Sequence, residues 1–314
     1  MKILNYNEVW IAQRADPYVY RHADGSYYFT ASLPEYNGIA LRKADSLEML
    51  PYAEEVMIWR KHEHGPMSFH VWAPELHYID QRWFIYFAAG EAEDIWKIRP
   101  YVLECVGDDP INDSWIERGI MQCADTDEFS FRSFSLDATV FENKGKYYFI
   151  WAEKVGVGKQ ISNLYIAEME SPIKLKTVQV LLTTPDYEWE RKGFWVNEGP
   201  SVIRKNGKIF ITYSASETGI DYCMGMLSID ENADLLDPKK WQKKRYPVLQ
   251  SNTEKGIYGP GHNSFTKDSQ GNDIIVYHAR TETEIIGNPL YHPNRHAMLM
   301  KIEWDSNGEP LFQF

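Results

Sequence analysis

Apolar segments separated by polar turns recur at nearly constant intervals along the chain. Each recurrence is a short apolar run, a polar turn that usually contains glycine, and then a run rich in aromatic and β-branched residues. Such runs suit half-buried strands, and dipeptides such as Asn206-Gly207 supply the positive φ of a tight turn. We therefore predict five β-hairpins, which cover residues 17–32, 74–90, 138–153, 200–216 and 263–280.

A further apolar segment follows each hairpin and ends near Asp, Ser or Pro. These segments are residues 39–50, 101–110, 164–172, 223–238 and 297–310. Successive hairpins start 57, 64, 62 and 63 residues apart, which leaves each unit room for a fourth, less regular edge strand. Radial repetition of antiparallel sheets is typical of β-propellers. We predict an all-β fold, a five-bladed β-propeller forming a single domain over residues 1–314, in preference to a β-sandwich with coincidental spacing.

Charge narrows the range of partners. The formal net charge is −12 and no Lys/Arg-rich block is present, so a phosphate backbone or an anionic membrane surface would be repelled. Residues 1–16 lack the apolar core of a signal peptide, and no apolar run approaches the roughly 20 residues that span a bilayer. We expect a cytoplasmic protein with a neutral partner and no nucleic-acid or membrane contacts, and its oligomeric state stays open.

Acidic residues occur at equivalent places in three of the five units. The residue or two just before the first strand of each unit are Asp16, residues 73–75, Asp137, Glu198 and His262. If that strand is the innermost of its blade, all five places ring the mouth of one axial channel. Any single acid could be a solvated surface group. Three acids at one register of a repeat instead predict a shared functional site.

Three converging carboxylates suit the hydrolysis of glycosidic bonds. That reaction needs one protonated carboxyl group to donate a proton and one ionised carboxylate to activate water or attack carbon. Apolar neighbours and like charges raise a carboxyl pKa, so one of the three acids should stay protonated near neutral pH. Glu198 follows the apolar residues 194–196 and is the candidate acid, whereas Asp16, close to Arg14 in an Ala-Asp-Pro turn, is the candidate ionised base.

The segments at the five blade openings are similar to known motifs. In chain order they read ADPYVYRHADGSYYF, HVWAPELHYIDQRWFIYFAA, SLDATVFENKGKYYFIWAE, NEGPSVI and GPGHNSF. Together they resemble the blade-opening motifs of glycoside hydrolase family 43, over residues 16–304. The resemblance implies a catalytic propeller of inverting enzymes, with Asp16 as general base, Asp137 as pKa modulator that positions the acid, and Glu198 as general acid. Inversion needs room for a water, so the carboxyl groups of Asp16 and Glu198 are expected about 6.5 to 9.5 Å apart.

The resemblance also implies roles for three further residues. Trp72 would face the sugar ring, or else be a buried tryptophan between blades. His262 would lie near the channel axis, bind substrate and help to hold a hydrated metal ion, often calcium, or else be a core histidine. Arg280 would contact the substrate or the modulating acid, or else form a surface salt bridge. No cofactor is expected for the chemistry itself, and the glycine-rich residues 259–264 lack the lysine and strand-to-helix setting of a phosphate loop.

The family resemblance leaves the sugar open between α-L-arabinofuranosides, β-D-xylosides, internal arabinan bonds and terminal galactosides. Residues 73–96 look most like arabinofuranosidase members. We therefore expect removal of terminal α-L-arabinofuranosyl residues from small arabinose-containing oligosaccharides, with a β-D-xylosidase as the alternative. A related clan of fructan-cleaving propellers is disfavoured because its NDPNG, RDP and EC signatures are absent. A non-catalytic sugar-binding propeller is disfavoured because all three acids are present.

Overall fold

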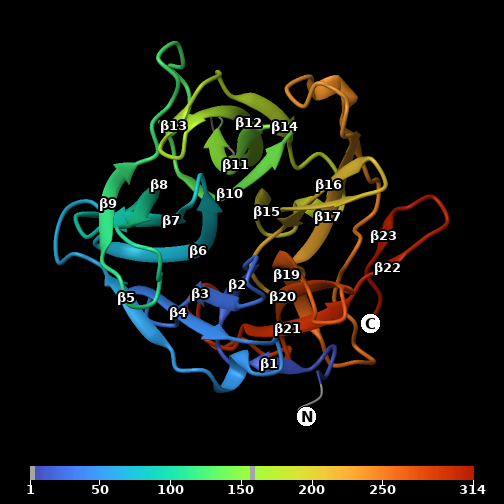
Figure 1. The fold of residues 1–314 in the computed structure, drawn as a ribbon. Helices are drawn as coiled ribbons and strands as arrows, with labels where there is room; N and C mark the ends of the chain where they lie inside the picture. Colours follow the sequence, from blue (N-terminus) through green and yellow to red (C-terminus); the bar gives the residue numbers. More distant parts are fainter. Residues whose placement is uncertain (1–3, 156–159) are drawn as a thin grey trace.

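The computed structural model describes residues 4–155 and 160–314, and within them the strands form five blades around one axis (Figure 1). In the first, second and fourth blades the strands follow chain order from the axis outwards, and in the third blade the last two strands both pair with the third strand. The first blade consists of β2 (Ala15–Arg21), β3 (Tyr27–Ser32), β4 (Gly38–Ala44) and β5 (Val56–Arg60), and the second of β6 (Phe69–Ile79), β7 (Arg82–Glu91), β8 (Asp94–Cys105) and β9 (Trp115–Ile120). The third blade consists of β10 (Ser135–Asn143), β11 (Lys146–Val155), β12 (Ile161–Ser171), β13 (Lys174–Leu175) and β14 (Val180–Thr183). The fourth blade consists of β15 (Trp195–Lys205), β16 (Lys208–Ala215), β17 (Cys223–Asp230) and β18 (Gln242–Lys243). The predicted all-β propeller is confirmed.

The fifth blade differs from the prediction in the origin of its outer strand. Its inner strands are β19 (Tyr258–Lys267), β20 (Asp273–Arg280) and β21 (His296–Lys301), but the fourth is the N-terminal β1 (Val9–Ile11), which pairs with β21. In Figure 1 the blue β1 lies beside the red β21. The last blade thus takes a strand from the start of the chain, and this pairing joins the first and last blades. Residues after β21 instead form the small hairpin of β22 (Glu303–Trp304) and β23 (Pro310–Leu311).

The hairpin turns form where the sequence predicts them. Asn206 and Gly207, between β15 and β16, have φ of 51° and 77°, the left-handed values that a two-residue turn between twisted strands requires. The described part of the chain also contains three short 3-10 helices, η1 (Leu50–Tyr52), η2 (Glu188–Glu190) and η3 (Pro238–Lys240). No helix among the described residues is long and apolar enough to cross a membrane.

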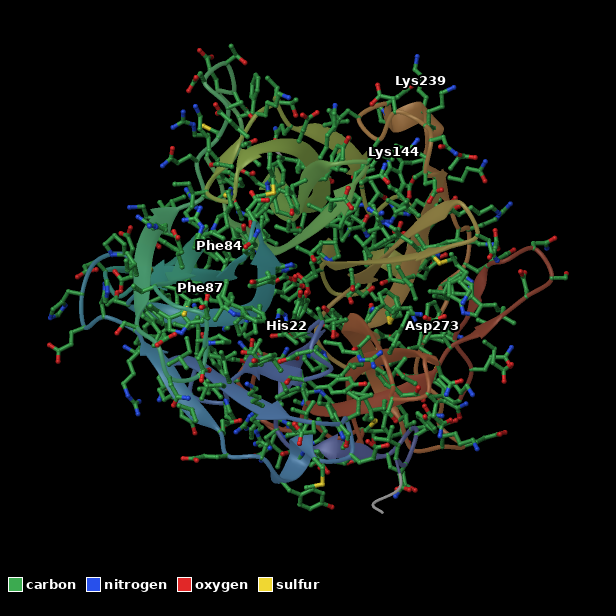
Figure 2. All side chains as sticks on the ribbon, in the orientation of Figure 1. His22, Phe84, Phe87, Lys144, Lys239 and Asp273 are labelled. Atoms are coloured by element: carbon green, nitrogen blue, oxygen red, sulfur yellow. The ribbon has the colours of Figure 1, made fainter. Side chains whose placement is uncertain are left out.

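Aromatic side chains fill the spaces between the blades. Phe84 and Phe87, three residues apart on β7, point to opposite faces of the second blade (Figure 2). Phe87 packs toward the first blade, with its ring centroid 5.2 Å from that of Trp59. Phe84 belongs to the apolar cluster shared with Phe149 and Trp151 of the third blade. Every blade therefore buries both of its faces, which fixes the inner strands relative to the axis.

The innermost strands share an irregularity that positions the site. Each of them contains left-handed backbone geometry at or next to the place that the repeat marks: Asp16 (φ 53°), Ala73 (47°), Asp137 (53°), Gly199 (55°) and His262 (41°). A second left-handed residue occurs in β6, His70 (49°), and in β19, Gly259 (56°). At every one of these places the pairing with the next strand shifts register, which is the mark of a β-bulge. The repeat predicts four of these residues, and Glu198 in place of Gly199, just before the strands. They lie inside them instead, because the bulge bends the strand without ending it.

Candidate active site

A pocket with a volume of about 1120 Å³ lies at the bulged parts of the innermost strands. Asp16, Asp137, Glu198 and His262, from four different blades, line it together. In Figure 2 side chains from all sides of the ring converge at its centre. The fifth place in the repeat, at residues 73–75, contributes no acid to the lining, since Glu75 pairs with His77 at 2.8 Å. The structure thus brings the three sequence-predicted acids and His262 together.

Asp16 is held as an ionised carboxylate. Its Oδ2 accepts a hydrogen bond from the Ser32 hydroxyl (2.5 Å), and its Oδ1 lies 3.2 Å from Nδ1 of His262 and 3.6 Å from Nη1 of Arg295. Burial raises the pKa of Asp16, but the positive charges of His262 and Arg295 outweigh burial and hold it well below its usual range. Arg14, expected beside this acid, instead pairs with Glu55.

The backbone of Asp16 is fixed separately, by His278. The amide N–H of Asp16 donates to Nδ1 of His278 at 3.0 Å, so this nitrogen carries no proton. Burial lowers the pKa of His278 to about 4, although the carboxylate of Asp16 acts in the opposite direction. His278 is therefore a neutral acceptor at neutral pH, and it holds a residue whose left-handed φ is costly for a side chain other than glycine.

His262 lies between two of the acids. Its Nδ1 is 3.2 Å from Oδ1 of Asp16 and 3.7 Å from Oδ2 of Asp137. Burial lowers the pKa of His262, but the neighbouring carboxylates outweigh burial and raise it above its ordinary value. Gly199 makes room for the ring, because a Cβ at this position would lie 3.1 Å from it. The imidazole therefore acts as a positive group that separates the carboxylates.

The expected calcium ion near His262 finds no support in this arrangement. Within residues 4–155 and 160–314, no group of three or more His, Cys, Asp or Glu side chains is arranged to hold a metal ion. Nδ1 of His262 faces carboxylate oxygens of Asp16 and Asp137 directly, so this nitrogen is already engaged by the acids. His262 is better described as a buried cationic partner of Asp16 and Asp137.

Asp137 and Glu198 both lie in surroundings that favour the protonated form. Burial raises the pKa of Asp137 well above its usual range, His262 acts against this shift, and the negative charges of Glu198 and Asp16 add to it. Oδ2 of Asp137 accepts the N–H of Gly199 at 3.1 Å, which ties this acid to the residue that follows Glu198.

Glu198 has a raised pKa for the same main reason, its burial. A hydrogen bond from the hydroxyl of Tyr222 to Oε1 (2.9 Å) and the charge of His262 act against the shift, whereas Asp16 adds to it. The sequence predicts one acid of raised pKa among the three. In the structure two have raised pKa values, because Asp137 and Glu198 are both removed from water.

Aromatic side chains form the walls of the pocket. Trp72 lines it and also packs against Tyr36 of the first blade, with ring centroids 5.7 Å apart, and against His70 of its own strand, at 4.3 Å. Its Nε1 is buried and, among the described residues, has no hydrogen-bond partner. Residues 194–196 line the pocket as expected, with Val196 buried and Phe194 exposed at the rim, where Trp96 is also half exposed.

Arg280 lies outside the pocket lining. Its guanidinium is buried and hydrogen-bonds to Nδ1 of His292 (2.9 Å) and to the carbonyl oxygens of Pro289 (2.8 Å) and Thr218 (3.3 Å), rather than to Asp137. It is thus neither a surface salt bridge nor a neighbour of the modulating acid. It holds the segment that carries Pro289, which does line the pocket.

Four residues of the site were missed by sequence reasoning. They are Ser32, Tyr222, His278 and Arg295. Ser32 and His278 come from the second strands of their blades, and the other two come from connecting segments, so none occupies the repeated register at the blade openings. The pocket therefore combines one carboxyl group whose pKa is lowered with two whose pKa values are raised, and acid–base catalysis requires such a separation.

Known proteins share this chain's sequence and fold. The family model described as glycosyl hydrolases family 43 matches residues 6–310. An alpha-L-arabinofuranosidase from Lactobacillus brevis, of known crystal structure, is 50% identical, covers 97% of this chain and 95% of its own, and superposes with a TM-score of 0.91. An extracellular exo-alpha-(1→5)-L-arabinofuranosidase of Streptomyces avermitilis and alpha-L-arabinofuranosidase 43 of Humicola insolens are each 45% identical over 96% and 98% of this chain. This chain spans only 61% and 63% of the length of those two relatives. The chain belongs to glycosyl hydrolases family 43.

Proposed function

We propose that this propeller is an inverting exo-glycosidase, which removes terminal α-L-arabinofuranosyl residues from small arabinose-containing oligosaccharides. One observation carries the proposal: an ionised Asp16 and a Glu198 of raised pKa face the same pocket. The sugar is inferred from the names of the similar proteins, each of which is an arabinofuranosidase. The cytoplasmic location and the extent of the catalytic domain remain predictions.

In the proposed reaction the two acids act on opposite sides of the scissile bond. Asp16 takes a proton from a water molecule as the oxygen of that water attacks the anomeric carbon. Glu198 gives its proton to the glycosidic oxygen as the bond from that oxygen to the anomeric carbon breaks. The new bond forms on the face opposite to the leaving group, so the configuration inverts. Asp16 ends protonated and Glu198 ionised, and exchange with solvent restores both.

The surrounding residues control the protonation and the position of Asp16 and Glu198. His262 and Arg295 keep Asp16 ionised, and the negative charge of Asp16 adds to burial in helping Glu198 to retain its proton. Asp137 accepts the N–H of Gly199 and so positions the backbone next to Glu198. Trp72 offers an aromatic face to the terminal sugar. The β-D-xylosidase alternative has weaker support, because solved structures with xylosidase in their titles, such as one from Bacillus halodurans, are under 20% identical and show the fold alone.

The decisive test compares hydrolysis of 4-nitrophenyl α-L-arabinofuranoside with that of 4-nitrophenyl β-D-xylopyranoside by the wild-type protein. We expect a strong preference for the arabinofuranoside and an inverted anomer as the first product by proton NMR. Asp16→Asn should abolish hydrolysis, and Glu198→Gln should lose more rate on arabinobiose than on the nitrophenyl glycoside, whose leaving group needs little protonation. A preference for the xyloside would overturn the proposed substrate, and retention would overturn the proposed role of Asp16.

A further inference from the structure

Tyr222 contacts the proposed acid directly. It lies just before β17, is 1% exposed, and lines the pocket. Its hydroxyl donates to Oε1 of Glu198 at 2.9 Å and also hydrogen-bonds to the hydroxyl of Ser214. Ser214 in turn accepts the backbone N–H of His262 at 2.7 Å. A continuous chain of hydrogen bonds therefore runs from the backbone of the fifth blade to the carboxyl group of Glu198.

The ring of Tyr222 contacts the residue that supports the proposed base. It is stacked on the imidazole of His278, with centroids 5.5 Å apart and planes only 6° from parallel. His278 accepts the amide N–H of Asp16, as described above. Tyr222 thus contacts Glu198 through its hydroxyl group, and it contacts His278, which holds the backbone of Asp16, through the face of its ring. Among the described residues, this is a direct structural connection between the two sides of the reaction.

The glycine-rich motif at 259–264 explains how this ring fits. A Cβ on Gly261 would lie 2.5 Å from Cε1 of Tyr222, closer than any real contact of this kind. Gly261 has no left-handed φ, so its requirement for glycine comes from space alone. The motif that lacks the features of a phosphate loop therefore has another use: it places His262 and leaves a slot for Tyr222.

We propose that Tyr222 is a positioning residue for both catalytic groups. Its hydroxyl donates a hydrogen bond to Oε1 of Glu198, so the proton that passes to the glycosidic oxygen is carried by Oε2. Its ring holds His278, and through His278 the backbone of Asp16, at a fixed separation from the acid. This assignment rests on the proposed acid and base roles, but its test includes a measurement that does not depend on turnover.

Several other charged groups face Glu198 and must be considered with Tyr222. They are Asp16 on β2, Asp137 on β10, Lys154 on β11 and His262 on β19. Those groups remain when the hydroxyl of Tyr222 is removed. A hydrogen bond donated to a carboxylate favours its ionised form, so loss of the hydroxyl should raise the pKa of Glu198 further.

The central experiment compares Tyr222→Phe with Tyr277→Phe. Tyr277 is also fully buried and donates to Oδ1 of Asn7, but it lies outside the pocket lining, so it controls for loss of a buried hydroxyl. For Tyr222→Phe we expect kcat on arabinobiose to fall roughly 10- to 100-fold, as for a lost hydrogen bond to a charged group, with a smaller fall on the nitrophenyl arabinofuranoside. The alkaline limb of the pH profile should move to higher pH. Equal losses on both substrates with an unmoved limb would overturn the proposal.

A carbon-13 NMR titration of glutamate side chains, with Glu198 assigned through Glu198→Gln, gives the turnover-independent measurement. The pKa of Glu198 should be higher in Tyr222→Phe than in the wild type, and unchanged in Tyr277→Phe. An unchanged value in Tyr222→Phe would overturn the positioning role even if the enzyme is active. If the proposed function itself were wrong, the result would be different: the wild-type protein would be inactive on arabinofuranosides.

Gly261→Ala tests the stacking separately, since it retains the hydroxyl but crowds the ring. We expect this variant to lose rate on both substrates, because the support of Asp16 moves together with Tyr222. Wild-type rates for Gly261→Ala in a folded protein would overturn the role assigned to the ring.

Discussion

Replacing Glu190 by glutamine is expected to destabilise the fold close to the active site. Glu190 lies at the end of η2, is 0% exposed, and precedes the strand that carries Glu198. Its carboxylate accepts from five donors: the backbone N–H groups of Asp186 (2.9 Å) and Tyr187 (2.8 Å), Nδ2 of Asn197 (3.0 Å), the hydroxyl of Tyr213 (2.9 Å), and Nζ of Lys243 (2.8 Å).

The size of the expected loss in free energy of unfolding follows from the direction of these hydrogen bonds. All five partners are donors, two or more at each carboxylate oxygen, so the NH₂ group of a glutamine would face at least two donors whichever way the amide turned. A buried donor left without an acceptor costs about 1–3 kcal/mol. Two such donors cost about 2–6 kcal/mol in free energy of unfolding. At about 1.5 °C per kcal/mol, which follows from about 2.1 cal/mol/K of unfolding entropy per residue over 314 residues, the midpoint of thermal unfolding should fall by at least about 3 °C.

Thermal unfolding of the wild type and Glu190→Gln checks this expectation, with Glu128→Gln as the control because Glu128 is exposed. The control should unfold within about a degree of the wild type. Since Asn197 adjoins Glu198 and is held by Glu190, kcat should also fall in Glu190→Gln at temperatures where the protein is folded. A Glu190→Gln protein that unfolds at the wild-type temperature would refute the reasoning, since the five donors would then have found other acceptors.

Two further predictions concern His278 and Gly199. The folded pKa of His278 is about 4, below the ordinary value near 6.5, so the unfolded chain binds this proton more readily and stability should fall as the pH drops from 6.5 toward 4. His278→Asn keeps an acceptor for the N–H of Asp16 but cannot bind this proton. The variant should therefore lose about 2 kcal/mol less stability than the wild type between pH 7 and pH 5, as measured by urea unfolding. An unaltered pH dependence would contradict the neutral buried imidazole. Gly199 (φ 55°) and Gly145 (φ 76°) both have left-handed backbone geometry, so Gly199→Ala and Gly145→Ala should each lose about 1 kcal/mol of stability. Only Gly199→Ala should also lose kcat/KM, because its Cβ would press on His262, whereas nothing lies within 4 Å of a Cβ at Gly145. Equal activity in the two variants would count against the role of His262.

The fold and the three acids could be predicted because their signals are local and repeated. Alternating apolar residues and turns such as Asn206-Gly207 define each hairpin within about twenty residues of chain. Because the blades are equivalent, Asp16, Asp137 and Glu198 share nearly one register, and the repeat itself brings them to the axis. No long-range contact had to be known for this step.

The partners of the acids could not be predicted, because they depend on contacts between distant segments. Arg14 is close to Asp16 in sequence, yet it pairs with Glu55, and the cation near Asp16 is Arg295. The outer strand of the fifth blade likewise comes from the N-terminus, which no pattern within that unit reveals. The family resemblance implied that Arg280 contacts the substrate or the modulating acid, but its hydrogen bonds are to a connecting segment.

The bulges divide the site into two parts with different physical origins. The left-handed residues of the innermost strands, among them Asp16 and Asp137, are strained by roughly 1–3 kcal/mol each and are held only because packed blades surround them. Part of the walls, by contrast, comes from strand ends and connecting segments, such as those that carry Trp96, Phe194 and Leu290, although Trp72 lies on the bulged strand β6. Acid–base chemistry therefore depends on the core of the fold, whereas the fit of the sugar depends in part on segments that can change without disturbing that core. Substitutions at Trp96, Phe194 or Leu290 should consequently alter which glycoside is hydrolysed while the pKa values of Asp16 and Glu198 stay the same.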